Sequence, residues 1–221
     1  QELATLRKQE IKELKYKLYF SIPEQKSVPV NGEITIEFNL DAPQEIILDF
    51  REKPEKIKSV SVNGQTARYE FHEKNIVEGK NNITIKFIAG NQSLNRNDEF
   101  LYTLLVPDRA RTLFPCFEQP NLKATFSLRL DIPTEWKAVS NTYITKEETK
   151  GNCKTVTFAP TEPLSTYLFS FVTGKLEHQE YIEGNRKISA YYRETDSKKV
   201  AQLDTIFKQV TASLNWLEEY T

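Results

Sequence analysis

Apolar and polar residues alternate with a period of two along most of this chain, and this pattern predicts a mainly β protein. The clearest run extends from Ala124 to Ile132, where every second side chain is apolar. Shorter runs of similar character cover residues 14–22, 34–40, 46–50, 57–62, 83–88, 100–106, 136–139, 154–158, 166–173 and 187–192. So many short strands predict a sandwich or a large twisted, curved sheet in which most strands run antiparallel.

Turn signals separate these runs. An Asn63-Gly64 pair stands between the apolar runs 57–62 and 65–71, and such a pair predicts a tight β-hairpin. Residues 91–99 are polar and contain no apolar alternation, which predicts a loop.

The two ends of the chain have the composition of helices. Residues 1–13 are rich in good helix formers and predict a short N-terminal helix. Asp196 or Ser197 suits an N-cap, and the apolar residues beyond them recur every three or four positions, which predicts an amphipathic C-terminal helix. Its apolar stripe comprises Val200, Leu203, Phe207, Val210, Leu214 and Leu217.

This helix has no stop signal, and the chain begins at Gln1 and contains no methionine. We therefore expect a piece of a longer protein. We also expect part of the stripe, at Val200, Phe207, Val210 and Leu217, to be exposed here because it would dock on a domain outside this chain.

A proline-stiffened loop from Arg111 to Lys123 follows the run 100–106. Pro115 and Pro120 each remove a backbone donor, so neither a helix nor a central strand is expected to pass through them. The loop is nevertheless apolar, and we expect it to pack on the core through Leu113, Phe114, Cys116, Phe117 and Leu122.

The overall charge argues against two classes of partner. Thirty basic and 31 acidic residues give a formal net charge of -1, which disfavours a dedicated surface for nucleic acid or for anionic membranes. The longest apolar stretch, residues 167–172, has the length of a strand and predicts no membrane span.

The residues that most often carry chemistry are few. His72 and His178 are not in a His-Glu-x-x-His arrangement, and we expect both at the solvated surface, with no metal site in this chain. Cys116 and Cys153 are not in a Cys-x-x-Cys spacing and are expected as free thiols, the first of them buried. An apolar setting disfavours the thiolate, so Cys116 is interpreted as structural rather than as a nucleophile.

Three charged residues, Arg111, Glu118 and Lys123, surround the proline-stiffened loop. They either hydrogen-bond to backbone groups that the prolines leave free, or face a cleft and meet a ligand. We favour the structural role because structural ion pairs are commoner than binding sites.

Residues 110–126, Ala-Arg-Thr-Leu-Phe-Pro-Cys-Phe-Glu-Gln-Pro-Asn-Leu-Lys-Ala-Thr-Phe, resemble the signature of the N-terminal domain of M1-family zinc aminopeptidases. In that family the run is close to Ala-Arg-x-x-Phe-Pro-Cys-Phe-Asp-Glu-Pro-x-x-Lys-Ala-x-Phe. Residues 163–172 resemble a second family segment, Pro-Met-Ser-Thr-Tyr-Leu-x-x-Phe, with Leu164 in place of the methionine. The matching signature residues include Arg111, Phe114, Pro115, Cys116, Phe117, Glu118, Pro120 and Lys123.

The resemblance implies a large saddle-shaped β domain over residues 1–195, followed at 196–221 by the first helix of a thermolysin-like catalytic domain. It implies a parent enzyme that removes N-terminal residues from peptides with one zinc ion. The family's zinc ligands lie downstream, so we expect this chain alone to hold no catalytic residue or cofactor and to be inactive. Its expected partners are its own catalytic domain and a peptide substrate.

The family's domain also shapes one wall of the substrate cleft, and here that wall falls on Leu104, Val106 and Pro107. The family usually carries a Gln-x-Glu-like pair at the first two positions, where it helps to hold the substrate's free amine. Three explanations for Leu104 and Val106 stay open: amine binding by the catalytic domain alone, a more apolar first subsite, or a non-catalytic member.

Two rival hypotheses follow from these residues. One is an M1-like scaffold that serves protein–protein contacts, since a fold alone does not imply activity. The other is a free-standing β-sandwich binding module. A chain start without methionine favours a bacterial periplasmic or cell-envelope location, with the cytoplasm as the alternative.

Overall fold

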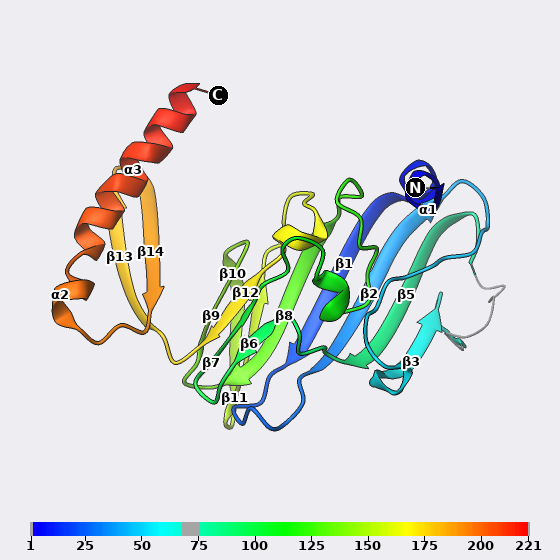
Figure 1. The fold of residues 1–221 in the computed structure, drawn as a ribbon, viewed down its shortest axis with the longest axis horizontal. Helices are drawn as coiled ribbons and strands as arrows, with labels where there is room; N and C mark the ends of the chain where they lie inside the picture. Colours follow the sequence, from blue (N-terminus) through cyan, green and yellow to red (C-terminus); the bar gives the residue numbers. More distant parts are fainter. Residues whose placement is uncertain (1, 68–75, 221) are drawn as a thin grey trace. The chain divides into compact units, whose positions relative to one another are not determined.

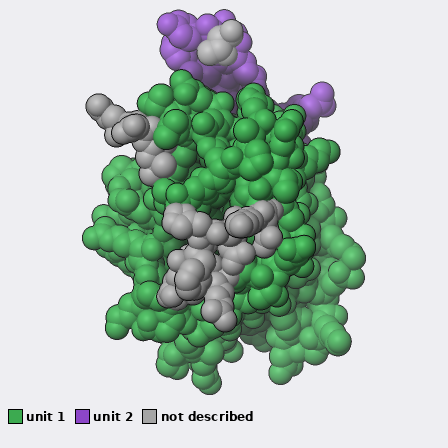
Figure 2. Space-filling view, turned by 90° about the vertical axis from the view of Figure 1, so that its right-hand side faces the viewer, with its two compact units in different colours: residues 1–174 green, residues 175–221 purple. Residues whose placement is uncertain are grey.

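The computed structural model describes residues 2–67 and 76–220. Contacts divide the chain into two compact units, residues 1–174 (unit 1) and 175–221 (unit 2), which Figure 2 colours separately. The boundary after residue 195, which the resemblance implies, stays a prediction.

Unit 1 is built on a large sheet with the strand order β10-β11-β8-β1-β2-β5-β3-β4 (Figure 1). Its strands are β1 (Lys12–Ser21), β2 (Asn31–Leu40), β3 (Ile57–Val62), β4 (Gln65–Ala67), β5 (Gly79–Ile88), β8 (Thr125–Pro133), β10 (Ile144–Lys150) and β11 (Cys153–Phe158). All neighbours pair antiparallel except β1 and β8, which run parallel with Tyr16 opposite Phe126. The predicted mainly β, mostly antiparallel fold is confirmed.

A smaller sheet of unit 1 has the order β6-β7-β12-β9. It consists of β6 (Leu94–Arg96), β7 (Phe100–Thr103), β12 (Phe171–Gly174) and β9 (Lys137–Ser140). The remaining elements of the unit are the helix α1 (Glu2–Glu10) and three 3₁₀ turns, η1 (Pro54–Lys56), η2 (Ala110–Thr112) and η3 (Thr166–Leu168). The predicted N-terminal helix is therefore present, although β1 already begins at Lys12.

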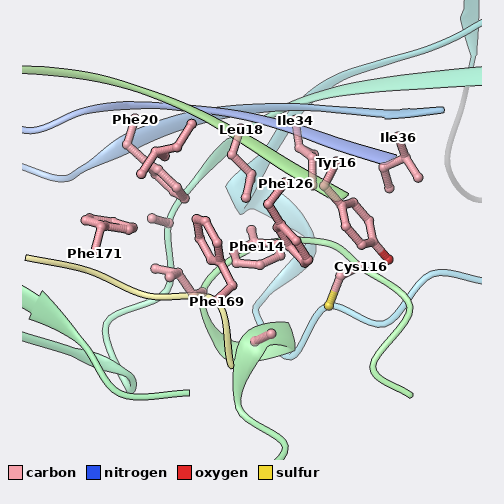
Figure 3. Close-up of a cluster of buried hydrophobic side chains, with 14 of the residues drawn as sticks. Tyr16, Leu18, Phe20, Ile34, Ile36, Phe114, Cys116, Phe126, Phe169 and Phe171 are labelled. Atoms are coloured by element: carbon pink, nitrogen blue, oxygen red, sulfur yellow. The ribbon is translucent and has the colours of Figure 1, made fainter. Parts of the chain in front are cut away.

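The core lies on one face of the large sheet, because alternation sends every second side chain of its strands to the same side. Tyr16, Leu18 and Phe20 of β1 and Phe126 of β8 meet Phe169 and Phe171, which come from the segment after η3 (Figure 3). Phe126 and Phe169 stack with ring centroids 4.8 Å apart. This aromatic cluster holds the segment with Phe169 and Phe171 against the large sheet.

Unit 2 is a hairpin with a helix on it. The hairpin is β13 (Glu177–Glu183) paired with β14 (Arg186–Tyr192), and two helices follow, α2 (Ser197–Val200) and α3 (Leu203–Tyr220). The Asp196 carboxylate accepts a hydrogen bond from the Lys198 amide, which confirms the predicted N-cap. Phe207 of α3 stacks on Tyr181 of β13, with ring centroids 5.4 Å apart.

The stripe of the C-terminal helix was predicted to be partly exposed: Val210 and Leu217 are exposed, Val200 is half-buried and Phe207 is buried. Phe207 is buried because the hairpin covers its face of α3, and the sequence pattern does not show which part of a stripe a neighbouring hairpin takes. The predicted single helix is also divided by residues 201–202.

Two strand predictions need correction. Residues 46–50 form no regular strand: only Asp49 pairs, in an isolated bridge with Cys116, because the neighbouring chain is the proline-stiffened loop. Residues 166–173 begin as η3 and become a strand only at Phe171. The predicted loop 91–99 contains the short strand β6.

The Asn63-Gly64 hairpin is confirmed between β3 and β4. Both residues have positive φ, 51° and 82°, which the tight turn requires and which asparagine and glycine tolerate best. The predicted second strand extended to residue 71, and residues 68–71 lie outside the described part of the chain.

Candidate functional site

The loop from Arg111 to Lys123 packs on the core as predicted. Its apolar side chains Leu113, Phe114, Cys116, Phe117 and Leu122 are all buried. The chain passes from η2 through a single bridge at Cys116, where the Cys116 amide donates to the Asp49 carbonyl and the Asp49 amide to the Cys116 carbonyl. No helix or strand runs through Pro115 or Pro120, as expected from their missing donors.

Polar side chains satisfy the backbone amides of this loop. The hydroxyl of Tyr16, fully buried in the core, accepts from the Phe117 amide at 2.9 Å. The Asp49 carboxylate accepts from the Glu118 amide at 3.0 Å. Burial raises the pKa of Tyr16 well above its usual value, so the phenol stays protonated and neutral. The loop is therefore a rigid corner, which we call the signature corner (residues 111–123).

Two of the three charged residues of the signature corner form contacts within or beside it, and the third is exposed. Glu118 holds the corner together, since its carboxylate accepts from the Arg111 amide at 2.8 Å and from the Thr166 hydroxyl. The Arg111 guanidinium pairs with Asp108 at 2.6 Å. These contacts favour the structural interpretation for Glu118 and Arg111. Lys123 is exposed, and none of the described residues forms an ion pair with it.

Cys116 is fully buried in the signature corner, and both cysteines are free thiols, as predicted. Burial raises the pKa of its thiol well above the usual value, and the nearby carboxylates of Glu118 and Asp49 raise it further. Because the thiolate is the reactive form, Cys116 is not arranged as a nucleophile.

Replacing Tyr16 with phenylalanine tests the corner's hydrogen-bond network. Tyr16→Phe leaves the buried Phe117 amide without its acceptor, which is expected to lower the free energy of unfolding by about 1–3 kcal/mol. Urea unfolding measures the change. Tyr102→Phe, which removes a hydroxyl from an exposed side chain, is the matched control and should change stability by less than about 0.5 kcal/mol. Equal losses in both variants would contradict the role assigned to Tyr16.

The predicted cleft wall lies just before the signature corner. Leu104 and Val106 are about half exposed, at 49% and 53%, whereas Leu105 between them is buried at 2%. Hydrogen bonds anchor the segment at both ends: Leu104 donates its amide to Ser93, and Arg109 donates its amide to Leu105. Two large apolar side chains are thus presented to solvent on a fixed backbone.

The small sheet continues this apolar surface. Tyr102 of β7 pairs with Val172 of β12, and Val172 pairs with Val139 of β9, so their side chains share one face of the sheet. Tyr102 is exposed, and the two valines are half-buried. We call this surface, with Leu104 and Val106, the outer apolar face of unit 1.

The described residues do not fit a zinc site, since no three His, Cys, Asp or Glu side chains among them converge. His178 was expected at the surface and is only partly exposed, because it stacks on Tyr191 with ring centroids 4.5 Å apart. His72 lies outside the described residues. None of the helices in the described part of the chain combines the length and hydropathy that a membrane span requires.

Three comparisons with known proteins match this chain to one family. The model of the peptidase M1 N-terminal domain matches residues 91–168, which include the predicted cleft wall and the signature corner. Over these residues the chain is similar to the peptidase M1 N-terminal domain.

Curated proteins similar to this chain come from plants and mammals. Aminopeptidase M1 of Arabidopsis thaliana is 40% identical over 78 residues, which are 35% of this chain and 9% of the relative. Glutamyl aminopeptidase of Homo sapiens is 34% identical over 116 residues, 52% of this chain and 12% of the relative. The chain thus spans only about a tenth of the length of these curated relatives.

A solved structure is similar to this chain in fold. The crystal structure of an M1 zinc metallopeptidase from Deinococcus radiodurans aligns with a TM-score of 0.66 and 19% identity, covering 82% of this chain and 47% of that one. The likeness in fold therefore extends well beyond the residues that the family model matches.

Sequence reasoning identified the signature corner but not the residues that support it. Arg7, Tyr16 and Asp49 come from α1, β1 and the segment before η1, far from the corner in sequence. The alternation of β1 places Tyr16 in the core, but nothing in the pattern indicates that its hydroxyl would serve a backbone amide.

Proposed function

We propose that this chain is the N-terminal, non-catalytic domain of a zinc metallo-aminopeptidase that removes N-terminal residues from peptides. The observation that carries the proposal is the match of residues 91–168 to the peptidase M1 N-terminal domain. The names of the relatives support it, since they include glutamyl aminopeptidases, and one similar structure is an M1 zinc metallopeptidase mutant bound to a Tyr-Ser-Ala substrate.

In this proposal Leu104, Val106 and Pro107 form one wall of the substrate cleft. Their support is the exposure of Leu104 and Val106 on an anchored backbone beside the signature corner. The wall would contact the substrate through apolar side chains, so it would favour apolar groups near the N-terminus of the peptide over charged ones.

The proposed partner of the domain is its own downstream catalytic domain, which would carry the single zinc ion. Two apolar surfaces support a partner of this kind. One is the outer apolar face of unit 1, and the other is the exposed part of the α3 stripe, at Val210, Leu214 and Leu217. We assign residues 1–195 to the β domain and 196–221 to the first helix of the catalytic domain. A bacterial periplasmic or cell-envelope location belongs to this proposal, and cell fractionation decides between it and the cytoplasm.

An activity assay tests the proposal. The natural full-length protein is expected to release the chromophore from aminoacyl p-nitroanilides and to lose this activity when a chelator removes zinc. The 221-residue chain is expected to release none. A full-length protein without chelator-sensitive activity would contradict the enzyme and support the M1-like scaffold for protein contacts, which Leu104 and Val106 favour because they replace the family's polar pair.

A substitution in the full-length enzyme tests the wall. Val106→Lys places a positive charge beside the substrate's free amine and is expected to lower kcat/KM for an apolar substrate by about tenfold. Val28→Lys is the matched control, since Val28 is also exposed, at 40%, but lies in the connection between β1 and β2. A similar change in both variants would contradict the assignment of Val106 to the cleft.

A further inference from the structure

The N-terminal helix α1 is attached to unit 1 in an unusual way. From Ala4 to Glu10 its side chains are exposed, apart from a half-buried Glu10 and a single buried one, Arg7. The buried residue is thus a cation rather than an apolar side chain. Helices in proteins normally gain most of their stability by packing an apolar face, and this part of α1 has none to pack.

Arg7 reaches two segments that are far away in sequence. One guanidinium nitrogen donates to the Asp49 carboxylate at 2.8 Å, and another donates to the Ile47 carbonyl at 2.7 Å. The guanidinium also lies over the Phe117 ring, 5.4 Å from its centroid. Charge-assisted hydrogen bonds of this kind are stronger than neutral ones, so Arg7 contributes strongly to the attachment of α1.

A second contact joins α1 to the signature corner. The buried amide of Gln119 donates to the Ala4 carbonyl in the first turn of the helix, at 2.9 Å. Gln119 and Phe117 therefore contact the helix directly. Asp49, which pairs with Arg7, forms a bridge with Cys116 and accepts a hydrogen bond from the Glu118 amide. The helix and the residues 116–119 share these contacts.

We propose that α1 is a strap that closes over residues 116–119 and opens with them in a local transition, without unfolding of unit 1. Arg7 is the positioning residue of this strap. Opening breaks these polar contacts and exposes Cys116 and Phe117, but it leaves the sheets intact, so it exposes far less surface than global unfolding. The inference does not depend on the proposed peptidase activity, because it concerns contacts inside unit 1.

Labelling of Cys116 reports on this opening, because Cys116 is fully buried in the segment that opens with the strap. Cys153 is exposed. In a Cys153→Ser background of the 221-residue chain, a thiol reagent such as 5,5′-dithiobis(2-nitrobenzoic acid) labels Cys116 only after opening. At low urea the labelling rate of the background chain is expected to be nearly independent of urea, as for an opening that exposes little surface. It should follow the steep urea dependence of global unfolding only near the unfolding midpoint.

Arg7→Met removes the guanidinium and keeps a long side chain. It is expected to raise the labelling rate of Cys116 at low urea by at least about tenfold, as for the loss of one hydrogen bond to a charged group. Lys8→Met removes the same charge from an exposed position of the same helix and should leave the rate unchanged.

Two results would overturn the strap. In the first, labelling of the background chain follows global unfolding at every urea concentration, a measurement that needs no variant at Arg7. In the second, Arg7→Met lowers global stability but leaves the labelling rate of Cys116 at low urea unchanged. A urea-independent rate that rises in Arg7→Met and not in Lys8→Met supports the strap.

Discussion

Phe169→Ala is expected to be the most destabilising single truncation in the aromatic cluster of unit 1. The ring is buried and contacts three others: Phe126 at 4.8 Å, Phe114 at 5.9 Å and Phe171 at 6.1 Å between centroids. Its removal leaves a cavity between the large sheet and the segments above it, at a cost of about 3–5 kcal/mol in the free energy of unfolding. This is a large fraction of the stability of an ordinary domain.

The neighbouring residue is a matched control for this change. Leu168 precedes Phe169 in the chain and is half exposed, so Leu168→Ala should change stability by less than about 0.5 kcal/mol. Urea unfolding followed by Trp136 fluorescence reports on unit 1, because Trp136 is fully buried there. The other tryptophan, Trp216, lies in unit 2 and is replaced by phenylalanine in all the proteins compared. Comparable losses from the two alanine variants would show that the ring is not a core element.

Gly90→Ala is expected to have the second largest effect. A Cβ at position 90 would lie 1.8 Å from the Thr112 carbonyl oxygen and 2.6 Å from the Glu52 carboxylate. The first neighbour is backbone in η2, and the Gly90 amide also donates to the Leu113 carbonyl, so neither chain can move freely. We expect a loss of about 3 kcal/mol or more in the free energy of unfolding, at the upper end of overpacking costs.

A second glycine distinguishes the cost of a steric clash from the cost of a left-handed backbone conformation. Gly151 lies in the turn between β10 and β11 with a φ of +60°, and a Cβ there would meet no atom within 4 Å. Gly151→Ala should therefore cost only the strain of a left-handed alanine, about 1–2 kcal/mol. If Gly90→Ala unfolded at the same urea concentration as Gly151→Ala, the close approach of the chains at Gly90 would be refuted.

Much of the fold could be predicted from the sequence because half-buried strands repeat the same side-chain alternation. This holds for β1, β2, β5 and β8, whose buried positions follow one another with a period of two. The strand β10 escaped prediction because all seven of its residues, Ile144–Lys150, are exposed at the edge of the sheet and carry no apolar alternation. β13 also escaped, since its residues are exposed or half-buried and their apolar pattern is weak.

The wrong strand predictions have a different cause. Residues 46–50 pack on the core as irregular chain with one bridge to the signature corner, and residues 166–169 place Phe169 in the core from a 3₁₀ turn. An apolar run records burial, and burial alone does not distinguish a strand from a packed loop. The parallel pairing of β1 with β8 was likewise invisible, because alternation fixes the face of each strand and not its neighbour.

The candidate site could also be predicted from the sequence only in part. The signature corner was visible because prolines and buried aromatic residues are concentrated in 13 positions, Arg111–Lys123. Arg7 and Asp49 were not recognised as its supports, because a single ion pair between residues 42 positions apart leaves no local pattern. A contact between residues so far apart in the sequence can be identified only when the fold is known.

The position of β1 has a consequence for synthesis of the chain. β1 is synthesised before both of its neighbours in the sheet, β2 and β8, and β8 ends only at Pro133. One edge of β1 therefore has no partner until more than a hundred further residues have been made. During that interval the nascent chain presents an unpaired apolar strand, and we expect it to bind chaperones that recognise such segments until β8 emerges.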